Sequence, residues 1–188
     1  MSATILAAVG AGDRPAVQAM LSAGDDANLR DEQGLTLLML AASLGDVAIV
    51  QALIDAGADV NAADARGWTA LACAVYNAEL KRGFPEVVRM LIGAGANLEA
   101  AIGFGVRPLM LAAGYGETQV VEALIEAGAD VSARNDGGYT ALMMVKQKHY
   151  VDVVNLLHEA EQRSGMGGCE SRNAPGSGVI TFMKRADA

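Results

Sequence analysis

At 188 residues the chain is long enough for one domain with a hydrophobic core and too short for two large ones. Residues 1–161 carry 10 basic and 20 acidic residues, and the whole chain has a net charge of −8. Because this excess repels phosphate backbones, we expect no nucleic-acid partner and favour a basic protein surface instead. Two cysteines are too few for a disulfide framework, so we expect reduced thiols. The apolar stretch at the start has no basic residue before it, which argues against a secretory signal. No run approaches the roughly 18 apolar residues of a membrane-spanning helix. We therefore expect a cytoplasmic protein without membrane insertion.

One segment repeats along the chain with a period of 33 residues. The segment "GLTLLMLAASLGDVAIVQALIDAGADVNAADAR" runs from Gly34 to Arg66, and similar segments begin at Gly67, Gly105 and Gly138. Stepping back 33 residues from Gly34 reaches Met1, where a weaker copy begins. Such a period indicates stacked units with atypical ends. The predicted units are 1–33, 34–66, 67–104, 105–137 and 138–161.

Each unit is predicted to form a helix, a tight turn, a second helix and an extended turn. In the second unit "TLLMLAASLG" predicts a short first helix that Gly45 ends. The next helix begins after Asp46 as its N-cap and ends before Gly57. Its apolar residues share one helical face, which a lone helix pair cannot bury, so the units must stack. These residues are Val47, Val50, Leu53 and Ile54.

These units resemble ankyrin repeats over residues 1 to about 160. The pattern D-x-x-G-x-T-P-L-H-x-A-A-x-x-G-x-x-x-V-V-x-x-L-L-x-x-G-A-D-x-N recurs at the right period, and its second copy runs from Asp31 through Asn61. The resemblance implies an all-α solenoid of about five helix-turn-helix units with β-turn fingers. In that family the fingers and the exposed side of each first helix line a concave groove that binds other proteins.

The chain departs from the family pattern at three places. The family's histidine, which helps to join neighbouring units, is replaced by Met39, Ala72, Met110 or Met143, so we expect stacking to depend more on apolar contact, with these methionines in the core. The fourth unit has Arg107 in place of threonine. The third unit has five extra residues within "NAELKRGFPE", where Lys81, Arg82, Phe84 and Pro85 extend the turn between its helices; that turn binds a partner or merely varies.

No group of residues points to catalysis, a cofactor or a metal. His149 and His158 lie nine residues apart without other ligands at a suitable spacing. Cys73 lies in "ALACAV", which favours a buried thiol over a nucleophile. The glycine pairs recur at the repeat period without a Gly-Lys-Ser/Thr, so they indicate helix ends and not a phosphate site.

Aromatic residues are concentrated at the predicted binding positions. Relative to the glycine that opens each unit, these lie one and two residues before it, and one, nine and ten after it. They make up 20 of the 188 residues, yet they hold five of the eight aromatic residues. Tyrosine and tryptophan favour binding hot spots, although packing against the neighbouring finger is an alternative. The predicted partner-binding residues are Leu35, Leu44, Trp68, Tyr76, Asn77, Phe104, Val106, Tyr115, Tyr139 and Lys148.

Residues 162–188 form a Gly- and Ser-rich tail that ends in "VITFMKR". Three possibilities stay open for segment 179–185: contact with the chain's own groove, capture by an external partner, or no contact at all. For the whole chain we predict a non-catalytic adaptor or regulator that binds another protein through an acidic groove lined with aromatic residues. The alternative is an inhibitor or immunity protein that blocks a basic toxic enzyme, and an enzyme with an unrecognised site is a third hypothesis.

Overall fold

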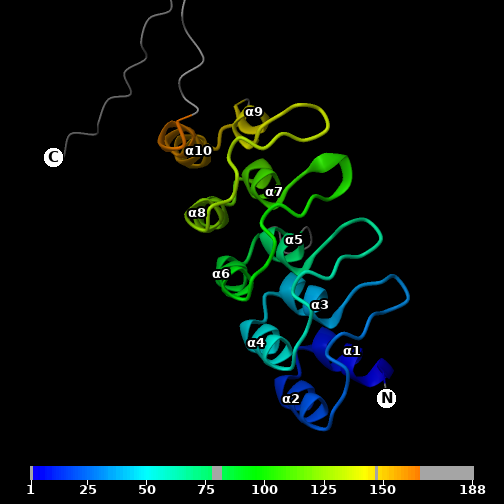
Figure 1. The fold of residues 1–188 in the computed structure, drawn as a ribbon. Coiled ribbons are helices and arrows are strands. Elements are labelled where there is room, and N and C mark those ends of the chain that lie inside the picture. The colour runs from blue at the N-terminus through cyan, green and yellow to red at the C-terminus, as the bar shows by residue number, and fades with distance from the viewer. Residues whose placement is uncertain (1, 78–81, 147, 166–188) are drawn as a thin grey trace, which may run out of the picture.

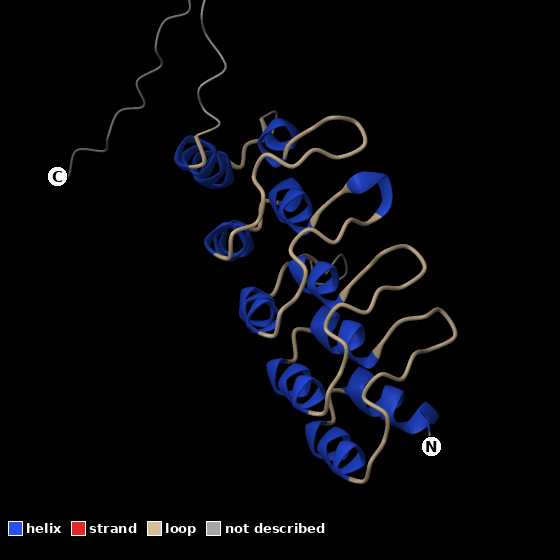
Figure 2. Cartoon of the chain, viewed as in Figure 1, coloured by secondary structure: helices blue, strands red, loops and turns tan. Residues whose placement is uncertain are grey.

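The computed structural model describes residues 2–77, 82–146 and 148–165, and within them five helix pairs stack in one direction (Figure 1). Figure 2 shows two layers of helices, with long loops projecting from one layer only. The inner layer, next to these loops, consists of α1 Ser2–Ala11, α3 Leu37–Leu44, α5 Ala70–Val75, α7 Pro108–Tyr115 and α9 Ala141–Val145. The outer layer consists of α2 Arg14–Ser22, α4 Val47–Asp55, α6 Pro85–Gly93, α8 Thr118–Glu126 and α10 Val151–Arg163. This all-α solenoid confirms the predicted fold, and α10 continues two residues beyond the expected end of the array.

Polar side chains begin several helices where the sequence predicts them. The buried hydroxyl of Thr36 accepts a hydrogen bond from the Met39 N–H, and Thr69 and Thr140 do the same at α5 and α9. Asp46 accepts from two backbone N–H groups at the start of α4, as predicted. Gly45 ends α3 in the left-handed region with φ 72°, where only glycine avoids strain.

One continuous core runs along the stack between the two layers. The inner helices contribute small residues as well as leucines, so neighbouring helices approach closely; the outer helices contribute one apolar face. Val50 and Leu53 are fully buried, and Val47 and Ile54 pack at the edge, which confirms the predicted face of α4. Met39 and Met110 are buried as predicted, but Met143, in the last described unit, is 42% exposed, contrary to the prediction.

Polar contacts join neighbouring units in addition to the apolar core. Asn28 donates to the Gly57 carbonyl and accepts from the Asp59 N–H. Asn61 joins units two and three in the same way, and the Glu99 carboxylate accepts from the Asp130 N–H. Side chains bonded to the backbone of the next unit therefore form a polar ladder along the stack.

The third unit differs from its neighbours around the insertion, of which residues 78–81 lie outside the described part of the chain. Helix α5 ends at Val75, so Tyr76 is extended and not helical, contrary to the prediction. Asn77 pairs with Arg82 in an isolated antiparallel bridge. Phe84 is not an exposed residue of the turn: it is 8% exposed and its ring covers Gly45 of the preceding unit.

Candidate functional site

The loops that project from the inner layer are four fingers, residues 30–36, 63–69, 101–107 and 134–140. In three of them one side chain holds the turn. Asp31, Asp64 and Asn135 each accept hydrogen bonds from the backbone N–H groups two and four residues later, at 2.8–3.0 Å. Each is followed three residues later by a glycine with positive φ.

The finger of residues 101–107 is held differently. Ile102 has no side-chain acceptor, and the turn forms through its backbone pairing with Val106 and a short 3-10 helix at its tip, η1 Gly103–Gly105. Within η1, Phe104 has φ 63°, the only positive φ among the described non-glycine residues. Its carbonyl accepts a hydrogen bond from the Asp136 N–H of the next finger at 3.1 Å. Its ring is 85% exposed, so no packing within the described residues accounts for this strained conformation.

A second group of predicted residues lies where the inner helices end. The rings of Tyr76 and Tyr115 stack with centroids 3.6 Å apart and an interplanar angle of 2°. The Asn77 amide donates to the Ser43 carbonyl at 2.6 Å, beside Leu44. The Lys148 ammonium donates to the Gly114 carbonyl at 2.5 Å, beside Tyr115. These contacts join units two to five into one band at the helix ends.

The ten predicted residues therefore form two groups. The helix-end group contains Leu44, Tyr76, Asn77, Tyr115 and Lys148. The finger group contains Leu35, Trp68, Phe104, Val106 and Tyr139. Because α7 begins after the finger and ends at Tyr115, about one eight-residue helix length, roughly 12 Å, separates the two groups.

Exposure divides the finger group again. Leu35, Trp68 and Val106 are half-buried, whereas Tyr139 at the same repeat position is 56% exposed. Leu44 and Tyr115 are exposed, while Tyr76 and Asn77 are half-buried. We call the exposed sides of the two groups together the finger-side surface.

Charge is divided between the two layers. None of the five inner helices contains a charged residue. The fingers carry both signs, as with Arg66 and Asp64, which form an ion pair at 3.1 Å. The outer helices and their N-caps hold ten acidic and three basic residues. The predicted acidic groove is therefore wrong: the acidic residues lie mainly in the other layer.

The described residues bring no catalytic group together. Burial and the nearby Asp64 carboxylate raise the pKa of the half-buried Cys73 thiol to about 12, which keeps it protonated and a poor nucleophile. His149 and His158 are both exposed, and His158 lies 3.0 Å from the Gln162 amide. Over the ranges that the structure describes, no three His, Cys, Asp or Glu side chains are placed to hold a metal ion.

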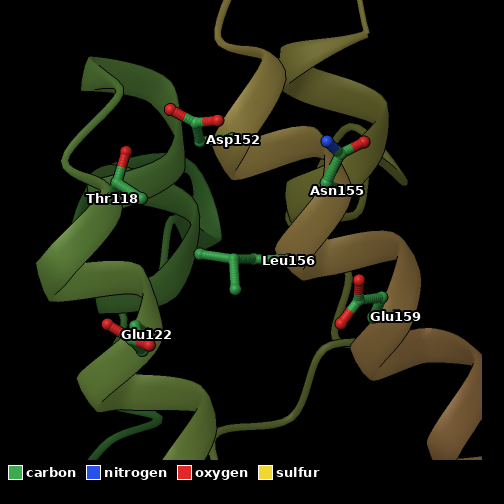
Figure 3. A pocket seen from close by; sticks show the side chains of 6 residues that line it. All are labelled: Thr118, Glu122, Asp152, Asn155, Leu156 and Glu159. Carbon is green, nitrogen blue, oxygen red and sulfur yellow. The ribbon is translucent and has the colours of Figure 1, made fainter. Parts of the chain in front are cut away.

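A shallow pocket lies between α8 and α10 in the outer layer (Figure 3). Glu122 from α8 and Asp152 and Glu159 from α10 line it, with Leu156 between the two helices. Thr118 and Asn155 complete its lining. No helix in the described part of the chain has the length and apolarity needed to span a bilayer.

The repeat pattern does not predict the stacking of Tyr76 on Tyr115. Tyr76 lies nine residues after Gly67 and Tyr115 ten after Gly105, so strict alignment of units places them at different positions. The two cross-unit hydrogen bonds, Asn77 to Ser43 and Lys148 to Gly114, both span 34 residues. The spacing of 34 residues, one more than the repeat period, is the sequence signal for these two hydrogen bonds.

Comparison with protein families agrees with the fold and with the repeat period. A family model described as ankyrin repeats (3 copies) matches residues 5–101 and 78–165, which together cover most of the chain. No curated protein matches the chain. Ankyrin repeats are generally protein–protein interaction modules and are typically non-catalytic. With its five stacked helix pairs and projecting fingers, the chain belongs to the ankyrin-repeat family.

Proposed function

We propose that this chain is a non-catalytic adaptor or regulator that holds a partner protein on its finger-side surface. The surface combines charge-free inner helices, a stacked tyrosine pair and exposed aromatic rings on the fingers. Aromatic side chains bring a large apolar area with few rotatable bonds, which suits the centre of an interface. We expect the partner to contact both groups, across about one helix length.

The conformation of Phe104 is the observation that carries this proposal. A left-handed backbone costs a non-glycine residue roughly 1–2 kcal/mol. Gly103 and Gly105 flank it, yet the chain has phenylalanine and not a third glycine at the tip. Burying a phenylalanine side chain in an interface returns roughly 1.5–3 kcal/mol. An exposed ring kept at a strained position therefore favours a binding role.

Replacing Phe104 by glycine tests the proposal because it separates stability from binding. Phe104→Gly removes the backbone strain and the ring together, so we expect the free energy of unfolding to stay level or to rise by roughly 0.5–1 kcal/mol. Capture of the partner from cells that express the protein should fall at least about tenfold, the loss of roughly 1.4 kcal/mol of binding free energy. Chemical denaturation and quantitative affinity capture with mass spectrometry measure the two effects.

Two further variants complete this experiment. Val151→Ser removes an apolar side chain of similar exposure outside the finger-side surface, so its capture should match that of the wild type. The double variant Trp68→Ala with Phe104→Ala should lose capture while remaining folded. Undiminished capture by both Phe104 variants would refute the proposed surface.

The charge distribution weakens the alternative of an inhibitor or immunity protein for a basic toxic enzyme. That alternative depended on an acidic groove, but the inner helices are uncharged and the fingers carry both signs. A toxin gene beside the gene for this chain would revive it. Catalysis by the purified protein without a partner would favour the third hypothesis, an enzyme.

Segment 179–185 lies outside the described residues. In this proposal it is a candidate occupant of the finger-side surface, together with an external partner. Deleting residues 172–188 distinguishes the possibilities: higher partner affinity indicates a competing tail, lower affinity indicates a docking peptide, and unchanged affinity indicates neither. A cytoplasmic location stays a prediction from the sequence.

A further inference from the structure

The last unit exposes more apolar surface than an end unit should. Four of the seven exposed large hydrophobic side chains in the described residues belong to it: Tyr139, Met143, Tyr150 and Val151. Among its described side chains the first unit has none. Solvent-facing end units of a repeat array need a polar outer face to keep the protein soluble. Within the described residues, the C-terminal end of the array therefore leaves apolar side chains uncovered and the N-terminal end does not.

Three of these residues occupy positions that the following unit covers elsewhere in the array. Met39 and Met110 are at most 2% exposed, but Met143 is 42% exposed. Val47 lies half-buried in a cleft against the next unit's Phe84, whereas Val151 at the same repeat position is 63% exposed. We call the surface made by Tyr139, Met143 and Val151 the end face.

Tyr139 shows the same effect. Leu35, Trp68 and Val106 hold its position in earlier units and are half-buried, Leu35 and Val106 against the core, while Tyr139 is 56% exposed. Within the described residues no unit stacks on it from the C-terminal side, and it also lies on a finger. The end face therefore consists of stacking positions that stay exposed, and it runs from the finger through the inner helix to the outer helix of the last unit.

We propose that the chain's own segment 179–185, "VITFMKR", packs on this end face and closes the array. The segment supplies the missing apolar cover through Val179, Ile180, Phe182 and Met183. Lys184 and Arg185 follow at once, and α10, which borders the end face, carries Asp152, Glu159 and Glu161 against a single arginine. The inner helices of the finger-side surface offer no acidic residue to this basic pair. Asp152 and Glu159 line the pocket against α8, and the fingers also carry carboxylates such as Asp64. The exposed apolar side chains of the end face, and not its charge, therefore carry this placement.

The length of chain beyond α10 fits this placement. Thirteen residues, 166–178, separate the last described residue from the segment. As a flexible linker they span roughly 20 Å on average and at most about 45 Å. Helix α10 has 13 residues and is roughly 20 Å long. Val151, at the start of α10, therefore lies within reach of the segment in the same chain.

Paramagnetic broadening of methyl NMR signals tests the placement in the full chain. A spin label is attached at Ala186→Cys with Cys169→Ser, since the half-buried Cys73 thiol, with a pKa of about 12, resists labelling. We expect strong broadening of the Met143 and Val151 methyl signals and unchanged signals from Leu44 and Val106. Broadening at Leu44 or Val106 instead, or at no methyl group, would overturn the proposal.

A mixed sample and two variants complete the test. In the mixed sample, spin-labelled chains without isotope are combined with isotope-labelled chains without spin label. If the Met143 signal broadens as strongly there as in the doubly labelled chain, the segment binds the end face of a second copy, which would overturn the proposal. Phe182→Ser should abolish the broadening, while the matched Thr181→Ser keeps it. Deleting 179–185 should speed amide hydrogen exchange in α9 and α10 only, and lower the Tm by roughly 2–4 °C. Unaltered exchange there would contradict the inference.

The proposal does not depend on the function proposed above. Loss of partner capture by Phe104→Gly with no broadening at Met143 would support the binding surface and refute the end-face contact. The reverse result would do the opposite.

Discussion

At the scale of single residues, the carboxylate of Asp64 shows how one side chain holds a finger. Burial alone would raise its pKa, but the backbone N–H groups of Trp68 and Arg66 and the Arg66 guanidinium outweigh burial and lower the pKa below its ordinary value. A lowered pKa means that the folded state binds the proton less tightly than the unfolded chain does. The pKa of Asp130 is also lowered, because the hydroxyl and the N–H of Ser132 both donate hydrogen bonds to its carboxylate.

These shifts predict a loss of stability in acid. The contribution is fully present above the unfolded pKa, about 3.9, and is lost as the pH falls through the lower folded value. We expect the free energy of unfolding to decrease below about pH 4, with a smaller decrease in Asp64→Asn. At pH 7 the substitution Asp64→Asn should lower the free energy of unfolding only a little, because Asn135 accepts the same two hydrogen bonds in the last finger. Urea denaturation of both proteins between pH 7 and pH 2.5 checks this; equal slopes in acid would contradict it.

The repeat period predicts all four fingers, but the residue types at the turns explain how only three of them are held. Asp or Asn followed by glycine specifies a turn through local hydrogen bonds, so the sequence alone suffices. Phe104 depends on the backbone of η1 and on the Asp136 N–H of the next finger, which are not local. The sequence located the aromatic cluster, and only the structure reveals the strain.

At the scale of helices, rings from one unit cover the helix ends of the unit before it. A Cβ on Gly45 would lie 2.2 Å from the Phe84 ring, and one on Gly116 would lie 2.9 Å from the Tyr150 ring. Phe84 and Tyr150 take the N-cap positions of α6 and α10, where they make no side-chain capping bond. The sequence predicted the glycines as helix ends, but their aromatic covers come from another unit, where no local rule predicts them.

Alanine substitution at two glycines separates this contact from backbone strain. Gly57 has φ 83° and open space around it, so Gly57→Ala should cost only the strain, roughly 1–2 kcal/mol. Gly45→Ala adds a collision with the Phe84 ring and should cost roughly a further 1–3 kcal/mol. Thermal and urea denaturation measure both free energies of unfolding. Equal losses would mean that the Phe84 ring moves aside freely.

At the scale of the whole molecule, the two layers differ in charge and in the expected response of their contacts to salt. The inner helices are uncharged, and the outer helices and their N-caps are strongly acidic. Screening by salt weakens contacts between exposed charges far more than it weakens apolar burial. The ionic-strength dependence of partner binding thus reports which layer is used.

We expect binding to the captured partner to depend little on salt. Raising NaCl from about 0.05 M to about 0.5 M should change the Kd by less than roughly threefold if the finger-side surface makes the contact. Docking on the acidic outer layer would weaken by more than about tenfold over the same range. Calorimetry at several salt concentrations decides between the layers.

The paired glycines and rings also limit how this array could be rebuilt. Tyr150 of the fifth unit needs a left-handed glycine at the end of the preceding inner helix, which Gly116 supplies. The third unit has no such glycine there, because α5 runs directly into the extended Tyr76. An in-frame deletion of the fourth unit would keep the repeat period. It would, however, place the Tyr150 ring against the end of α5, where no left-handed glycine makes room for it. The units form an ordered set with specific neighbours, and they are not interchangeable modules.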